Sequence, residues 1–184
     1  MSELDELREV QTASREIFGG KIMHVFEDTV RLPDGNAATR EYMRHIGAVC
    51  VIPVLENGDV LVERQYRYPV GQVLTEIPAG KLDRRDEDRL LAAQRELREE
   101  TGAEAGEWTS LGLFYPACAY SDEAIEMFLA RGIRFGERHL DKDEFLNVTR
   151  MPLAALLEAV MAGEVPDAKT QIAVLKAARL LGLR

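Results

Sequence analysis

The sequence predicts an α+β fold, with a mixed β-sheet between helices and a small antiparallel β unit at the N-terminus. Three observations lead to this prediction. Strand-type alternation of apolar and polar residues dominates the chain before residue 80. Helix-type signals occur in only three segments, at about 83–101, 152–162 and 167–181. Strands and helices do not alternate regularly, as a doubly wound parallel sheet would require, so an α/β/α sandwich is expected.

The length of 184 residues and the hydrophobic content of 46% fit one domain, or one domain with a modest extension. The net charge of −9 argues against non-specific binding to nucleic acid or to anionic membranes. The charged N-terminus is unlike a signal peptide and no apolar run is long enough to span a membrane, so a cytoplasmic protein is expected. Cys50 and Cys118 are both expected to be buried, reduced thiols.

Residues 1–45 are expected to form the small β unit and residues 46–184 the main domain. Strands are expected over 10–17, 21–32 and 38–45. Gly19-Gly20 and Pro33-Asp34-Gly35-Asn36 supply the turns between them. Three strands are few for an independent core. The unit is therefore expected to pack on the main domain or on a second subunit.

The main domain begins with Gly47 to Leu55, whose nearly continuous apolar residues predict a strand buried on both faces. Pro53 has no N–H to donate, which indicates a bulge or an unpaired side at that position. Asn57-Gly58 predicts a hairpin turn. Further strands are expected over 60–66, 73–77, 108–115, 123–131 and 145–151, and a polar loop over 132–142.

The first helix is expected between Gly80 and Gly102, with Asp83 or Asp86 as its N-cap. Gly102 suits the left-handed position that follows a helix. The apolar stripe consists of Leu90, Ala93 and Leu97.

Three carboxylates share one side of this helix, since Glu96, Glu99 and Glu100 are spaced at i, i+3 and i+4. Like charges at this spacing destabilise a helix unless a cation offsets them. Arg95 lies four residues before Glu99, and Glu100 lies at the edge of the apolar stripe, where a buried carboxylate requires a cation. A hard ion such as Mg²⁺ prefers such oxygen ligands. The alternative is a solvated acidic face.

This stretch resembles the signature of the Nudix hydrolases. The matching residues are Gly80, Glu87, Arg95, Glu96, Leu97, Glu99, Glu100, Gly102 and Ala103. One departure is an extra residue between Gly80 and Glu87, which places six residues there. Residues 17–180 are similar to the ADP-ribose pyrophosphatase branch, through stretches such as TREYMRH, VERQYRYPVG, EIPAGKLD and DAKT.

The resemblance implies a Nudix-type sandwich and a homodimer that exchanges its N-terminal β units. It also implies about two or three Mg²⁺ ions per site, with Mn²⁺ as a possible substitute. Glu96, Glu100, Glu99 and the Ala79 carbonyl would be the metal ligands. Arg95 would orient the carboxylates, and Glu87 would support the helix and the loop.

The general base is expected in the loop after the signature. Glu144 matches best, with Asp141 and Asp143 as alternatives, and a solvated acidic turn is the structural alternative. Substrate contacts implied by the resemblance are Arg67 at the diphosphate or terminal ribose, Arg40 across the dimer, Glu41 at the adenine amino group and Glu123 at the ribose or a metal-bound water. Surface salt bridges are the alternative for each arginine.

The expected activity is Mg²⁺-dependent hydrolysis of ADP-ribose to AMP and ribose 5-phosphate. One alternative is the same chemistry on another nucleoside diphosphate, such as a sugar nucleotide, a dinucleotide or FAD. A second alternative is a Nudix-like module that senses a ligand without hydrolysing it, against which the intact carboxylates argue. The expected partners are a small nucleotide and a second subunit, with no nucleic acid and no membrane.

Overall fold

The computed structural model describes residues 6–139 and 145–183, and the chain forms two compact units. One unit extends to His45 and includes the segment Ala117–Glu123; the other consists of Ile46–Pro116 and the chain from Ala124 onward. The segment 117–123, expected in the main domain, joins the first unit through backbone contacts. Met43 donates to the Tyr120 carbonyl at 2.9 Å and accepts from the Asp122 N–H at 3.2 Å.

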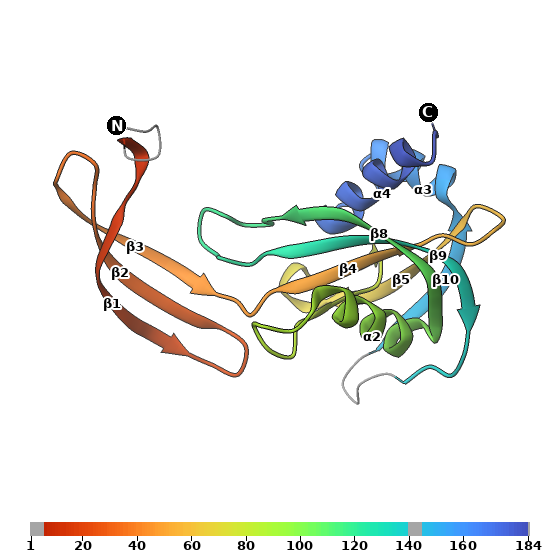
Figure 1. Cartoon of the computed structure of the whole chain (residues 1–184), viewed down its shortest axis with the longest axis horizontal. Coiled ribbons are helices and arrows are strands. Elements are labelled where there is room, and N and C mark those ends of the chain that lie inside the picture. Colours follow the sequence, from red (N-terminus) through yellow and green to blue (C-terminus); the bar gives the residue numbers. More distant parts are fainter. Residues whose placement is uncertain (1–5, 140–144, 184) are drawn as a thin grey trace. The chain divides into compact units, whose positions relative to one another are not determined.

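The N-terminal unit is a three-stranded antiparallel sheet in the order β1-β2-β3, drawn in red to orange in Figure 1. The strands are β1 (Val10–Gly19), β2 (His24–Arg31) and β3 (Ala37–Arg44). Every residue of β1 is exposed, and Phe18 keeps 57% of its surface accessible. The predicted strands are confirmed, and so is the expectation that this unit has little core of its own.

The second unit contains two sheets. The mixed sheet has the order β7-β4-β9-β8, in which β4 and β9 are parallel and the other pairs are antiparallel. Its strands are β4 (Ala48–Pro53), β7 (Ala79–Lys81), β8 (Ala103–Phe114) and β9 (Ile125–Phe135). The antiparallel sheet, in the order β10-β5-β6, consists of β5 (Asp59–Arg67), β6 (Gln72–Glu76) and β10 (Leu146–Pro152). A short 3-10 helix, η1 (Tyr68–Val70), joins β5 to β6.

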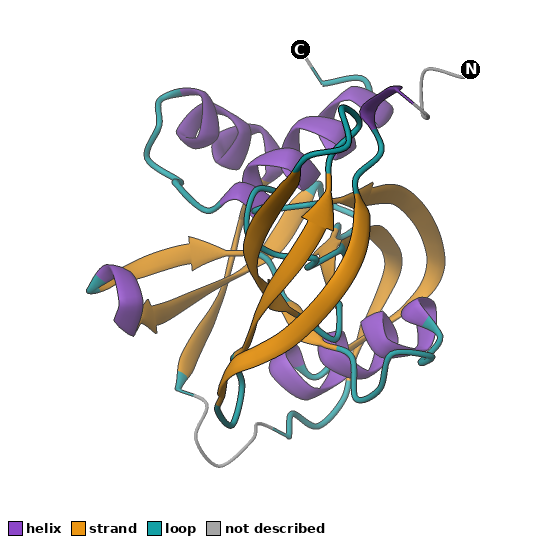
Figure 2. Cartoon of the chain, turned by 90° about the vertical axis from the view of Figure 1, so that its left-hand side faces the viewer, coloured by secondary structure: helices purple, strands orange, loops and turns teal. Residues whose placement is uncertain are grey.

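Helices cover both faces of the mixed sheet, as Figures 1 and 2 show, which confirms the predicted sandwich. The helices are α2 (Arg89–Thr101), α3 (Leu153–Met161) and α4 (Ala168–Leu180). Alternate residues of β4 point to opposite layers, because Val49 and Val51 pack with α2 whereas Cys50 and Ile52 pack with α3 and α4. Each fully buried side chain of this size contributes about 1.5–3 kcal/mol of hydrophobic stabilisation.

Pro53 lies at the end of β4, beyond the three residues that pair with β7, so its missing N–H leaves no gap in that ladder. Among the described residues, no helix has both the length and the apolar character needed to cross a bilayer.

The structure corrects four local predictions. No strand was predicted at residues 79–81, but they form the short strand β7 because they pair with Ala48–Cys50 of β4. The N-cap of α2 is Asp88, whose side chain accepts from the Leu91 N–H at 3.0 Å, not Asp83 or Asp86. Strand β9 continues to Phe135, where a loop was predicted, because its outer half pairs with the start of β8. Cys118 is exposed, whereas Cys50 is buried and its burial raises the pKa of the thiol to about 12.

Candidate active site

Helix α2 places two carboxylates at the border of the core. The stripe residues Ala93 and Leu97 are fully buried beneath the sheet. Glu96 and Glu100 follow the same side of the helix and keep only 9% and 5% of their surface accessible. The Glu99 side chain is more open, at 39%. The predicted partial burial of Glu100 is therefore what the structure has.

Gly80, in β7, lies directly against the Glu96 carboxylate. A Cβ atom built on Gly80 would lie 2.0 Å from the Glu96 carboxyl carbon and 2.2–2.3 Å from its oxygens. Gly80 does not have a positive φ, so the glycine is required for space and not for backbone conformation. The strand can approach the helix at this point only because residue 80 has no side chain.

The residue before Gly80 contacts the second carboxylate. The Ala79 N–H donates to Glu100 Oε2 at 2.9 Å. Two consecutive residues of β7 therefore lie against two carboxylates that are one helical turn apart. This arrangement brings the peptide of residue 79, the predicted carbonyl ligand, to the carboxylates of α2.

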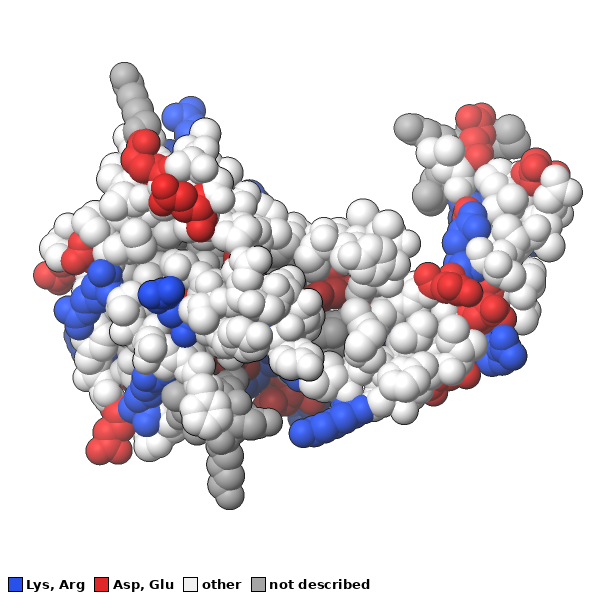
Figure 3. Space-filling model, turned by 180° about the vertical axis from the view of Figure 1, so that it is seen from behind, with Lys and Arg blue, Asp and Glu red and all other residues white. Residues whose placement is uncertain are grey.

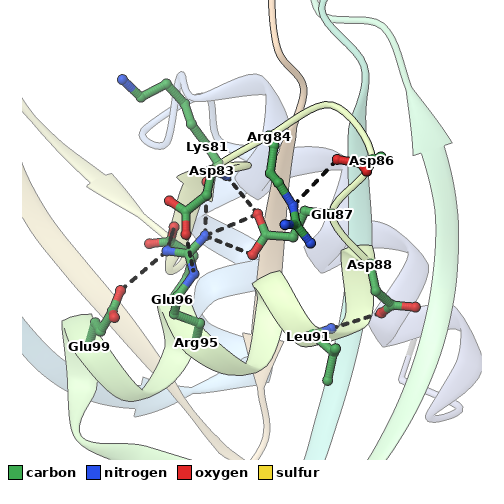
Figure 4. A network of polar contacts seen from close by, with 10 residues as sticks. All are labelled: Lys81, Asp83, Arg84, Asp86, Glu87, Asp88, Leu91, Arg95, Glu96 and Glu99. Atoms are coloured by element: carbon green, nitrogen blue, oxygen red, sulfur yellow. Dashed lines mark hydrogen bonds and ion pairs between the residues drawn. The ribbon is translucent and has the colours of Figure 1, made fainter.

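Arg95 provides the positive charge that this acidic cluster needs (Figure 4). Its Nη1 donates to Glu96 Oε1 at 2.6 Å and to Glu99 Oε2 at 3.3 Å. Its Nη2 donates to the Lys81 carbonyl at 3.2 Å and reaches Glu87 Oε1 at 3.4 Å. Partial burial disfavours the charged guanidinium, but the surrounding carboxylates, Glu96 foremost, outweigh burial and raise the pKa of Arg95. Arg95 therefore stays charged and holds the carboxylates in place.

The extra residue of the signature is accommodated in the loop between β7 and α2. Glu87 Oε2 accepts from the Asp83 N–H at 2.6 Å, and the Glu87 N–H donates to the Arg84 carbonyl at 3.1 Å. The turn closed by these bonds leaves Glu87 within reach of Arg95. The departure from the family pattern thus changes the loop without separating its glutamate from the helix.

Arg67 lies at the end of β5 and makes a two-point contact with Glu76 of β6. Its Nε and Nη2 donate to the two carboxylate oxygens of Glu76, each at 2.7 Å. Hydrogen bonding to Glu76 is the main cause that raises the pKa of Arg67, and the charge of Glu100 also contributes.

Sequence reasoning missed Glu76. It is 2% exposed, and it faces Glu63, also buried, across the β5–β6 pair. Two signals in the sequence pointed to it: Glu76 begins EIPAGKLD, one of the stretches that carry the family resemblance, and it directly precedes the apolar Ile77 and the turn at Pro78.

The remaining predicted residues lie elsewhere. Arg40 and Glu41 are consecutive on β3 of the N-terminal unit, so their side chains point to opposite faces of that sheet. Arg40 pairs with Glu9, its Nε 2.9 Å from Oε2. Glu123 belongs to the same unit, and its Oε1 is 3.7 Å from His45 Nδ1. Glu144, with its alternatives Asp141 and Asp143, lies outside the described residues.

Residues 43–172 match the NUDIX domain, so the chain belongs to the Nudix family. The contact of Gly80 with the Glu96 carboxylate of α2 lies within this match. Residues 10–43 match the nucleoside diphosphate sugar hydrolase N-terminal domain. Both matches confirm the resemblance inferred from the sequence.

Individual relatives show which members of the family this chain is similar to. The chain is 39% identical over 173 residues to an ADP-ribose pyrophosphatase of Bacillus subtilis, covering 93% of each protein. It is 37% identical over 155 residues to an ADP-ribose pyrophosphatase of Mycobacterium tuberculosis, covering 83% of this chain and 75% of the relative. A methanol dehydrogenase activator of Bacillus methanolicus is 36% identical over 176 residues, covering 95% and 94%. The crystal structure of an ADP compounds hydrolase shares the fold, with a TM-score of 0.83 over 95% of each chain at 20% identity.

Nudix hydrolases generally need divalent metal ions, and the oxygen donors of this site suit a hard cation. The buried carboxylates of Glu96 and Glu100 adjoin the peptide of Ala79, and Gly80 leaves the space that one of them occupies. Within the described ranges, no three Asp, Glu, His or Cys side chains are already grouped as a metal site. Glu96 and Glu99 both accept from Arg95 Nη1.

On one face of the molecule, the basic side chains of the described residues do not form a single large patch (Figure 3). On the face drawn in Figure 3, basic and acidic side chains lie in small separate groups. With a net charge of −9, a negatively charged substrate has to be bound by local cations.

Substituting Gly80 with alanine tests the contact between β7 and Glu96. We expect Gly80→Ala to weaken Mn²⁺ binding by at least about tenfold to a hundredfold, the loss typical when a group that orients a metal ligand is changed, because the new Cβ forces the Glu96 carboxylate away. Calorimetric titration with Mn²⁺ measures the affinity. Gly106→Ala is the control, since a Cβ there meets only the Gly132 carbonyl oxygen at 3.8 Å. Equal Mn²⁺ affinity in wild type and Gly80→Ala would contradict the assignment.

Proposed function

We propose that this Nudix protein hydrolyses the diphosphate of ADP-ribose to AMP and ribose 5-phosphate in the presence of Mg²⁺. The observation that carries the proposal is the pair of buried carboxylates, Glu96 and Glu100, held against Ala79 and Gly80. ADP-ribose as the substrate is supported by the two pyrophosphatase relatives at 37–39% identity.

Glu96, Glu99, Glu100 and the Ala79 carbonyl would hold the metal, Mg²⁺ in first place and Mn²⁺ as a substitute, with about two or three ions per site. Bound there, the metal supplies charge neutralisation at the diphosphate and lowers the pKa of a bound water. Arg95 and Glu87 keep the ligand carboxylates oriented through the bonds described above. The chain thus contributes positioning and charge, and it needs no covalent nucleophile.

Three residues would act on the substrate and on water. Glu144 is proposed to accept the proton of the attacking water. Arg67 would bind the diphosphate or the terminal ribose, since its side chain is held by Glu76 and remains 41% exposed. Glu123 would contact the ribose or a metal-bound water.

We also propose a homodimer in which the N-terminal units are exchanged, with 1–45 and 46–184 acting as separate domains. The exposed β1 strand and the exposed apolar side chains of Ile17 and Phe18 support a partner surface on this unit. In this arrangement Arg40 and Glu41 would bind the adenine nucleotide in the site of the other subunit.

A substrate panel combined with Glu100→Gln tests the activity. Wild type is expected to cleave ADP-ribose with the highest kcat/KM among nucleotide sugars, dinucleotides and FAD in Mg²⁺. Glu100→Gln should retain its bond from Ala79 but lose a ligand charge, so kcat should fall by more than the tenfold to hundredfold typical of an indirect partner. Unchanged turnover in Glu100→Gln would sink the metal assignment. A compound with a higher kcat/KM than ADP-ribose would identify another nucleoside diphosphate as the substrate. Binding without turnover would identify the protein as a ligand sensor.

Single substitutions in the loop after the signature identify the base. We expect Glu144→Gln to lower kcat by about 10²–10⁴-fold, the contribution of a positioned general base, with little effect on KM for ADP-ribose. Asp141→Asn and Asp143→Asn are matched controls for the loss of one negative charge. Steady-state kinetics identifies the base. If Asp141→Asn or Asp143→Asn lowers kcat more than Glu144→Gln does, that aspartate is the base and Glu144 is not.

Mixing two defective subunits tests the exchange. When Arg40→Ala and Glu100→Gln proteins are unfolded together and refolded, half of the dimers should be mixed, and one of the two sites in each should carry no defect. Activity should recover to about a quarter of the wild-type value. The separately refolded variants provide the baseline. No recovery, or a monomeric mass by light scattering in an active sample, would refute the exchanged dimer.

A further inference from the structure

A buried ion network centred on Glu76 includes a lysine for which the proposed mechanism has no role. Glu76 accepts two bonds from Arg67 and a further bond from Lys169 Nζ, at the start of α4. The Lys169 side chain is 12% exposed and the Glu76 side chain 3%. Lys169 Nζ also lies 3.0 Å from Asp167 Oδ1. Each charge of this network thus has a partner of opposite sign.

The N-terminus of α4 also holds the backbone segment that runs from Glu76 to Ala79. Asp167 Oδ2 caps α4 by accepting from the Thr170 N–H at 2.9 Å and from its hydroxyl at 2.6 Å. Thr170 Oγ1 in turn accepts from the Ile77 N–H at 3.0 Å. Ile77 follows Glu76 and lies two residues before Ala79. The segment Asp167–Thr170 therefore fixes both the side chain of Glu76 and the backbone after it.

Ionisation of Glu76 depends on its two cations. Burial acts against the charged carboxylate, but the bond from Arg67 and the charge of Lys169 together lower the pKa of Glu76. A carboxylate bound on both sides cannot rotate. Because Lys169 holds Oε2, the plane of the Glu76 carboxylate is set, and with it the plane of the Arg67 guanidinium.

Arg67 differs from the other members in its exposure. Its side chain is 41% accessible. Two of its nitrogens, Nε and Nη2, are occupied by Glu76, and Nη1 makes no bond to another described residue. A guanidinium fixed on one edge and open on the other is suited to bind a phosphate oxygen.

We propose that Lys169 is a positioning residue that orients Arg67 for substrate binding, acting through Glu76. The proposal rests on the proposed function, in that Arg67 contacts the diphosphate or its terminal ribose. The competing explanation is a salt bridge that only stabilises the fold, which would leave KM unchanged in a folded variant.

Steady-state kinetics on the full chain distinguishes the two explanations. Lys169→Met is expected to raise KM for ADP-ribose by about tenfold while kcat changes by less than about twofold, the pattern of lost binding that is equal in ground and transition states. Lys169→Arg should restore KM to within about threefold, since it retains the charge. The Mg²⁺ concentration for half-maximal activity should not change. Lys176→Met is the matched control on α4, because Lys176 bonds the Leu111 carbonyl, outside the network.

A double-mutant cycle tests the route through Arg67. In an Arg67→Met background, adding Lys169→Met should raise KM by less than about twofold, because the group that Lys169 positions is gone. Equal effects in both backgrounds overturn the proposal. It is also overturned if Lys169→Met lowers kcat alone, or lowers the melting temperature with KM unchanged. If Lys169→Met does not fold, the same cycle is carried out with Lys169→Gln, which removes the positive charge and leaves Glu76 in place.

The wild-type panel separates failure of this proposal from failure of the proposed function. If another nucleoside diphosphate is preferred, the proposed substrate fails, and the Lys169 cycle is measured on that compound. If there is no turnover, calorimetric binding of ADP-ribose in Ca²⁺ replaces KM. Wild-type protein that neither cleaves nor binds any compound of the panel overturns both.

Discussion

The close approach of β7 to α2 is the contact on which the candidate site depends. It brings two carboxylates out of water and against a peptide backbone, which is unfavourable unless each charge finds partners. The Ala79 N–H supplies one such partner, and the absence of a side chain at Gly80 supplies the space. Any larger residue at position 80 would have to displace the Glu96 carboxylate. The close contact between the carboxylates of α2 and strand β7 therefore requires glycine at position 80.

Arg95 and Arg67 both supply positive charge, but they are held in place in different ways. Arg95 lies on the same helix as the carboxylates and contacts them directly, so its geometry follows from helical spacing. Arg67 comes from another sheet and is held by Glu76, which is held in turn by a lysine of α4. Buried ion pairs of the second kind add little net stability because desolvation offsets the attraction. In a protein that must bind an anionic substrate, these pairs are better explained by the orientation they give to Arg67 than by a gain in folding stability.

The N-terminal unit obeys a different constraint. Its three strands pair in the order β1-β2-β3, yet β1 is exposed along its whole length and the unit buries few apolar residues. Such a unit gains stability and function by contact with another surface. In the proposed dimer, Arg40 and Glu41 of this unit act in the site of the second subunit, whereas the carboxylate helix and its strand form within one unit.

The sequence by itself determined most of the strands, the helices, the sandwich and the family, because apolar periodicity and the spacing of Glu96, Glu99 and Glu100 are local properties. It did not predict β7 (Ala79–Lys81), which is too short for a periodic pattern and forms by pairing with β4. It also predicted the partial burial of Glu100 from helical rotation alone. The true N-cap, Asp88, and the extension of β9 to Phe135 were missed, since a cap depends on where the loop leaves the sheet and an extended strand on what pairs with it. Only the tertiary structure joined Glu76 to Arg67 and Lys169. Residues 76 and 169 are 93 positions apart, and no periodic pattern relates side chains that meet through the packing of separate elements.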